Sequence, residues 1–219
     1  MSRLTTSRVV VALAAVALST AACTADDRSA AAPRPSVSAA PPERVVIPGR
    51  PGESATITDT DNVKAPDGST YNTIDTAFVQ MMIVHHGQAI EMSKLAPERA
   101  GDPGLKALAE RIGAAQAPEV AFMKSWLQAR RLPDDDPNHD HSTMPGMQTP
   151  ADMTALAGLR GADFDRRFVD MMTAHHRGAM QMSEDVIMGG TDEQLREVAG
   201  EISIEQGSEI NRMVQLGIK

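Results

Sequence analysis

The chain of 219 residues is 42% hydrophobic and 23% charged, an ordinary composition for a soluble domain with one core. Its formal net charge of -8 and its 3% of aromatic residues argue against nucleic-acid binding, which needs a basic surface and favours stacking side chains. Methionine is the unusual residue: there are 14, and many lie close in sequence to one of the 6 histidines.

The first 22 residues are typical of an export signal. Arg3 and Arg8 give it a positive start, and its apolar stretch, residues 9–18, is shorter than the ~20 residues of a membrane-spanning helix. Small residues precede Cys23, the single cysteine, as in the lipobox of bacterial lipoproteins. We therefore expect an exported lipoprotein, anchored through Cys23 to the extracytoplasmic face of the cell membrane. A plain secretory signal followed by a free thiol is the alternative.

Residues 23–69 are rich in alanine, proline, serine and glycine, and they show neither a helical nor a strand period. A segment of this composition cannot bury a core and is expected to be an extended tether. The folded domain is therefore expected over residues 70–219.

The folded domain contains an internal repeat, in which residues 78–86 (FVQMMIVHH) match residues 168–176 (FVDMMTAHH) at an offset of 168 − 78 = 90. The match extends into a second segment, where five residue types recur in register: Leu105, Ile112, Gln116, Glu119 and Met123 match Leu195, Ile202, Gln206, Glu209 and Met213. Two helices therefore repeat together, in units 73–130 and 163–216.

Apolar residues spaced three and four apart predict helices near 73–96, 103–130, 163–188 and 192–216. Capping signals support these boundaries: Asn72 or Thr73, Asp102 with Pro103, Asp163, and a capping box over residues 191–194 behind Gly189 and Gly190. The stretch between the second and third helices is too long for a tight turn and includes a predicted short helix, 150–159, behind Thr149. The expected fold is all-α, a four-helix bundle of two helix pairs joined by one long crossover.

Each unit places polar residues where a core is expected. One histidine of each pair, His85 or His175, falls on the apolar stripe of its helix, and the next histidine lies about 100° further round. The second helix of each unit carries glutamine and glutamate on its own apolar stripe. Because buried polar groups are costly unless paired, these side chains should meet the histidines. They would form either a hydrogen-bonded layer that fixes the register of the bundle or part of a metal site.

The third histidine pair, His139 and His141, lies in the crossover with Met144 and Met147, where no apolar period exists and core packing is not expected. Imidazole with thioether selects copper, particularly Cu(I), because zinc takes few thioethers and calcium and magnesium prefer oxygen. Outside the cell, methionine is the practical soft ligand because thiolates oxidise there. We expect a mobile copper-capture segment; a polar linker is the alternative.

Residues 70–217 resemble domain-of-unknown-function family 305 (DUF305), which includes CopM-type periplasmic copper-binding proteins; the shared motifs are the doubled Met-x-x-His-His, the Gln-x-x-Glu after it and the His-x-His of the crossover. The resemblance implies a ferritin-like bundle and, in some members, copper binding and tolerance. It implies these copper ligands: His85, His86, His175, His176, Met81, Met82, Met171 and Met172. Two features depart from the pattern. Pro118 should interrupt the second helix, and Gln181 replaces Glu91 in the second unit, so the two halves need not bind equally.

The expected function is copper binding for sequestration, tolerance or transfer, without catalysis. Further residues are expected to support or join the ligands: Gln116, Glu119, Met123, Gln206, Glu209 and Met213. A metal-free interaction bundle at the cell envelope is one alternative. A ferritin-like di-metal oxidase is disfavoured, because it needs Glu-x-x-His and the sequence has none. The expected partners are a metal ion and, through the lipid, the membrane; self-association or a copper-exchange protein stays open.

Overall fold

The structure is a computed structural model that describes residues 44–47, 56–59 and 63–219, so the expected export signal and Cys23 lie outside the described residues. Strand β1 (Arg44–Ile47) pairs antiparallel with β2 (Thr56–Asp59), and β3 (Val63–Lys64) pairs antiparallel with β4 (Thr70–Tyr71). The expectation that residues 23–69 contain no strand is therefore wrong. Short β-branched runs such as residues 45–47 favour pairing even between prolines. Val63 is buried in the core, so packing begins before residue 70.

C-terminal to the strands, most of the described residues are helical, which confirms the all-α expectation. The long helices are α1 (Thr73–Arg99), α2 (Pro103–Arg130), α4 (Gly161–Gly189) and α5 (Glu193–Gln215). The short α3 (Pro150–Gly158) and the 3-10 helix η1 (His141–Thr143) lie in the crossover. Each predicted helix is present, with its ends shifted by at most a few residues. Within the described part of the chain, no helix has the length and apolarity to cross a membrane.

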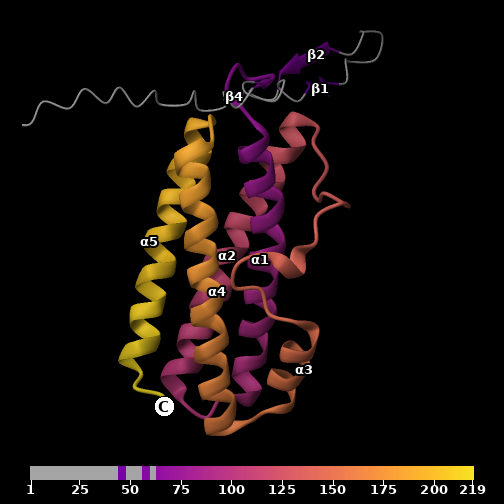
Figure 1. Ribbon diagram of the computed structural model, residues 1–219. Helices are drawn as coiled ribbons and strands as arrows, with labels where there is room; N and C mark the ends of the chain where they lie inside the picture. The colour runs from indigo at the N-terminus through magenta and orange to yellow at the C-terminus, as the bar shows by residue number, and fades with distance from the viewer. Residues whose placement is uncertain (1–43, 48–55, 60–62) are drawn as a thin grey trace, which may run out of the picture. The chain divides into compact units, whose positions relative to one another are not determined.

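The four long helices pack side by side (Figure 1). Helix α1 contacts α2 and α4, and α5 contacts α4 and α2. The crossover, residues 131–160, leads from the end of α2 to the start of α4, and its α3 packs against α1 and α4. The repeat is therefore a pair of helical hairpins, α1–α2 and α4–α5, as the sequence predicted.

Capping side chains explain most of the helix starts. Asn72 forms a capping box with Asp75, Asp102 accepts from the Leu105 N–H, and Thr149 forms a capping box at the start of α3, all at the expected positions. Two expectations fail. Helix α4 begins at Gly161 without a side-chain cap, and Asp163 instead pairs with Arg166 inside its first turn. Helix α5 is capped by Asp192, which accepts from the Leu195 N–H, rather than by a box over residues 191–194.

The expected interruption at Pro118 is also wrong, because α2 is continuous from Pro103 to Arg130. Proline removes one backbone donor and strains the preceding turn. Residues on both sides of it, Ile112 and Met123, are fully buried, so tertiary packing holds the helix together across this position.

Two aspartates tie the hairpins to each other reciprocally. The Asp75 carboxylate of α1 accepts from the backbone N–H groups of Thr191 and Asp192, in the turn between α4 and α5. Its repeat equivalent, Asp165 of α4, accepts from the backbone N–H groups of residues 101 and 102, in the turn between α1 and α2. Both aspartates are buried, so these bonds fix how the two hairpins align along their length.

Candidate metal centre

A polar layer crosses the middle of the helical core and separates two apolar clusters. One cluster holds the first half of α1, the second half of α2, the second half of α4 and the first half of α5, including Phe78, Met82, Met123, Met182 and Leu195. The other holds the opposite halves, including Met92, Leu105, Phe168, Met172 and Met213. Between them, the buried polar residues are His85, His86, Gln116, His175, His176, Gln206 and Glu209. The sequence predicted that the histidines meet polar residues of the next helix, and both sets lie together between the two apolar clusters.

Each hairpin contains one histidine–glutamate pair, related by the repeat. His176 Nε2 donates to Glu209 Oε2 at 2.7 Å, and both side chains are buried. His86 Nε2 lies 2.9 Å from Glu119 Oε2, without the alignment of a hydrogen bond, and the Glu119 side chain is 18% exposed. The second hairpin thus holds its histidine in a tighter and drier environment than the first.

The other two histidines face each other between α1 and α4. The rings of His85 and His175 stack with their centroids 3.6 Å apart and an interplanar angle of 30°. His85 Nε2 donates to the Pro145 carbonyl oxygen at 3.0 Å. Burial lowers the pKa of His85 to about 3, and burial followed by the charges of the neighbouring histidines lowers the pKa of His175 well below its usual 6.5. Both imidazoles are therefore neutral near neutral pH, which is the form that binds metals.

Several polar atoms of the layer are buried without a partner. His85, His86 and His176 each direct Nε2 at an oxygen and leave Nδ1 unpartnered, and neither ring nitrogen of His175 has a partner. The side-chain amides of Gln116 and Gln206 are likewise buried and unpartnered. An unsatisfied buried polar group costs about 1–3 kcal/mol, so an ion or ligand that contacts these atoms would recover part of that free energy.

The layer offers imidazole donors, and buried methionines of the two apolar clusters add thioether sulfur on either side of it. Among the described residues, no three His, Cys, Asp or Glu side chains are grouped so that they could hold a metal ion. In each repeat, two methionines precede the histidine pair by a few residues. Three of these methionines are buried: Met82, Met171 and Met172. Imidazole together with thioether sulfur is a donor set that selects Cu(I).

The crossover is docked against the long helices, although the sequence predicted no core packing in this segment. Met144 is 4% exposed and belongs to an apolar core cluster, with Met147 packed against it, so core packing does explain part of this segment. The following turn is held from α1, where Gln88 Nε2 donates to the Gln148 carbonyl at 2.9 Å and Gln148 N donates to Gln88 Oε1 at 2.7 Å. The turn carrying Pro145 therefore covers His85.

The crossover histidines are not among the buried residues of the core layer. Their ring centroids are 5.0 Å apart, and His141 Nε2 lies 2.7 Å from Asp135 Oδ1. A cavity of about 30 Å³ beside them is lined by Ala77, Gln80, Met81, Asp136, His139 and His141. The structure thus brings Met81 to the crossover histidines.

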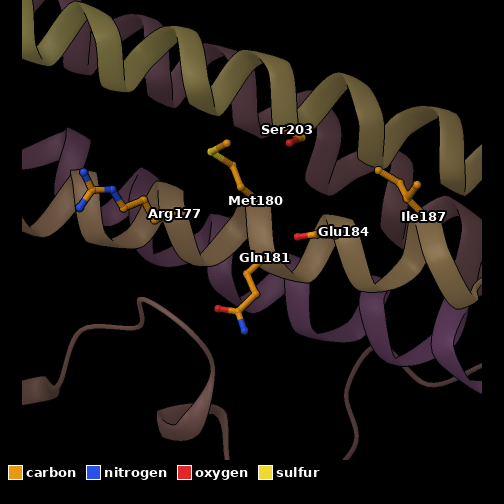
Figure 2. A pocket seen from close by; sticks show the side chains of 6 residues that line it. All are labelled: Arg177, Met180, Gln181, Glu184, Ile187 and Ser203. Atoms are coloured by element: carbon orange, nitrogen blue, oxygen red, sulfur yellow. The ribbon is translucent and has the colours of Figure 1, made fainter. Parts of the chain in front are cut away.

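A separate groove lies on the outer side of α4 and α5, with a volume of about 410 Å³. Figure 2 shows its lining side chains: Arg177, Met180, Gln181, Glu184, Ile187 and Ser203. The groove includes Gln181, where the second unit departs from Glu91 of the first, but no histidine lines it. We assign it no part in metal binding.

Sequence reasoning missed two groups beside the layer. Glu205 of α5 lies near Glu119 and Glu209, and burial, followed by the charges of these two carboxylates, raises the pKa of Glu205. Its repeat equivalent is Ala115, so the repeat gave no signal for it. The Pro145 carbonyl was also missed, because a backbone acceptor has no sequence signature.

The described fold and sequence match proteins of one family. The sequence model of a domain of unknown function, DUF305, matches residues 75–217. A DUF305 protein from Streptomyces coelicolor, described as secreted, is 33% identical, with 65% of this chain and 91% of that chain covered and a TM-score of 0.62. A DUF305 fragment from Deinococcus radiodurans is 27% identical, with 66% and 95% covered and a TM-score of 0.62.

A third similar structure contains metal. CopM in its Cu(I)-bound form is 30% identical, with 65% of this chain and 94% of that chain covered and a TM-score of 0.56. CopM has also been solved with Cu(II) and with Ag bound. No curated protein matches the chain.

Proposed function

The chain belongs to the DUF305 family, as its motifs predicted, and because copper-bound CopM is among the structures it resembles, we propose that it is an exported copper-binding protein. The ion is cargo, held for sequestration, tolerance or transfer to a partner protein. The protein performs no catalysis. Its ligands come from the buried polar layer: His85, His86, His175 and His176, with thioether sulfur from Met82, Met171 and Met172.

The observation that carries this proposal is which ring nitrogens of the histidines have a hydrogen-bond partner and which do not. Three histidines of the layer have Nε2 anchored on, or close to, an oxygen acceptor while Nδ1 is buried and free. Metal-binding histidines usually donate their second ring N–H to a carboxylate or a backbone carbonyl, which fixes the tautomer and aims the other nitrogen at the ion. Glu119, Glu209 and the Pro145 carbonyl supply these acceptors. Copper bound at the free nitrogens would remove the cost of leaving them unpartnered.

A metal-free bundle is the second candidate, supported by the His176–Glu209 hydrogen bond, which pairs His176 Nε2 with Glu209 Oε2 without metal. In that case the polar layer only fixes the register of the helices. This alternative leaves both nitrogens of His175 unexplained.

Copper titration distinguishes the two candidates. The full chain is titrated with Cu(I) against a competing chelator, beside a variant in which His85, His86, His175 and His176 are all replaced by alanine. We expect the variant to lose Cu(I) equivalents while far-UV circular dichroism stays helical. An unchanged copper stoichiometry in this variant would assign the histidines to structure alone.

The proposal includes export, a lipid anchor at Cys23 and a ferritin-like four-helix arrangement. The apolar N-terminal stretch and the small residues before Cys23 support the anchor, and the long crossover between two helical hairpins supports the ferritin-like topology. Labelled fatty acid should appear on the chain in cells and disappear with Cys23→Ser. Label that persists in this variant would contradict the anchor without affecting the copper proposal.

A further inference from the structure

The cavity between α1 and the crossover gathers donor atoms that the buried layer does not use. His139 and His141 of the crossover and Met81 of α1 line it, together with Asp136. Its volume of about 30 Å³ exceeds the ~10–15 Å³ that one water needs, so a single ion fits without displacing a side chain. Two imidazoles and a thioether thus meet at one small space.

Both histidines present a free nitrogen in this region. His141 Nε2 is held by Asp135 at 2.7 Å, and His141 Nδ1 is buried without a partner. His139 Nε2 is also buried without a partner. The contact between His141 and Asp135 repeats the arrangement of the interior, in which an oxygen fixes one ring nitrogen and leaves the other free.

Met81 is set apart from its repeat equivalent by the crossover. Met171 is 2% exposed and packs in an apolar cluster, whereas Met81 is partly exposed and faces the cavity. The crossover occurs once in the fold, so only the first hairpin can build this arrangement. Met144, by contrast, is buried in the core and does not line the cavity.

We propose that His139, His141 and Met81 form a second Cu(I) site, separate from the buried layer and reachable from the surface. The inference rests on the proposed function, because it assumes that the protein carries copper. Two imidazoles with a thioether favour Cu(I) and the chemically similar Ag(I) over zinc, calcium or magnesium. Met81 lies one helical turn before His85, so an ion held at the surface site is adjacent to the layer that the protein otherwise keeps buried.

The aspartates around the site strengthen it electrostatically. Asp135 contacts His141, Asp136 lines the cavity, and hydrogen bonds from Ser142 lower the pKa of Asp140, which keeps that carboxylate charged. Negative charge near a surface site raises the local concentration of cations. The site is therefore suited to accept the ion first.

Ag(I) titration of the full chain tests the inference, because Ag(I) undergoes no redox change during the measurement. Binding is followed by calorimetry and by the side-chain nitrogen resonances of His139 and His141. The double variant His139→Ala with His141→Ala should lose one equivalent, and Met81→Leu should weaken that equivalent more than about tenfold. Met188→Leu is the matched control, because Met188 is 82% exposed and should leave binding unchanged.

The outcomes separate this inference from the proposed function. Loss of one equivalent in the double variant, with that equivalent retained when the four histidines of the buried layer are replaced, supports a separate surface site. Undiminished binding in the double variant overturns the surface site and leaves the buried layer as the binding site. Weakening by Met144→Leu but not by Met81→Leu overturns the assignment of Met81. A wild-type chain that binds neither Ag(I) nor Cu(I) overturns both proposals.

Discussion

The crossover turn passes directly over Gly178 of α4, where there is no room for a Cβ, so Gly178→Ala should displace the turn. A Cβ at this position would overlap the Pro145 carbonyl and lie 2.9 Å from Gly146 N, and these are backbone atoms that cannot rotate away. The turn is also constrained at Gly146, whose φ of +76° favours glycine. The substitution must therefore move the turn or α4.

The expected cost follows from what the turn loses. Overpacking against backbone costs about 1–3 kcal/mol, and each disrupted hydrogen bond adds about 1 kcal/mol. The bonds at risk are His85 Nε2 to Pro145 O and the reciprocal pair between Gln88 and Gln148. Alanine gains up to about 1 kcal/mol over glycine inside a helix, so with all three bonds lost the free energy of unfolding should fall by about 3–5 kcal/mol.

Urea unfolding followed by circular dichroism measures this difference, with Gly87→Ala as the matched control. Gly87 lies in α1, and a Cβ there meets nothing within 4 Å. The control should be stabilised by up to about 1 kcal/mol, the opposite sign. If Gly178→Ala is as stable as the control, the docked position of the turn is wrong.

Two further predictions concern acid sensitivity and the helix turns. Burial holds the pKa of His85 at about 3, below its ordinary 6.5, and lowers that of His175 as well, so the unfolded chain binds more protons as the pH falls below 6.5. The free energy of unfolding should therefore decrease from neutral to mildly acidic pH, measured by urea unfolding, and this decrease should be smaller in a variant lacking both histidines. Asp192 caps α5 and also accepts from the Trp126 indole and a buried guanidinium, whereas its repeat equivalent Asp102 caps α2 without these two contacts. Asp192→Ala should cost about 3 kcal/mol or more and Asp102→Ala about 1 kcal/mol in thermal or urea unfolding; equal losses would contradict this difference.

The helices and the polar layer could be predicted because the same residue pattern occurs in both repeat units. The 90-residue offset between Phe78 and Phe168 (168 − 78 = 90) aligned both helix pairs, and glutamate on an apolar stripe indicated a partner at the same level. The contacts of His86 with Glu119 and of His176 with Glu209 confirm that pairing. Local periodicity and the cost of burying polar groups were sufficient there.

The crossover could not be predicted in the same way, because its conformation depends on surfaces far away in sequence. Its histidines were expected to use Met144 and Met147, but the core takes Met144, and Met81 of α1 lines the cavity instead. The Asp163 cap failed for a related reason: α4 begins two residues earlier, at Gly161, whose backbone pairs with Ala100. Contacts between segments far apart in sequence determine these positions, and local sequence signals do not.

The position of copper in the buried layer is the central claim, and anomalous diffraction at the copper edge tests it most directly. Crystals of the chain loaded with Cu(I) would be used, with His139 and His141 replaced by alanine so that only the interior can bind. We predict an anomalous peak next to His175, within bonding distance of an imidazole nitrogen and a methionine sulfur. A layer without such a peak, with its nitrogens bonded only to ordered water, would contradict the account.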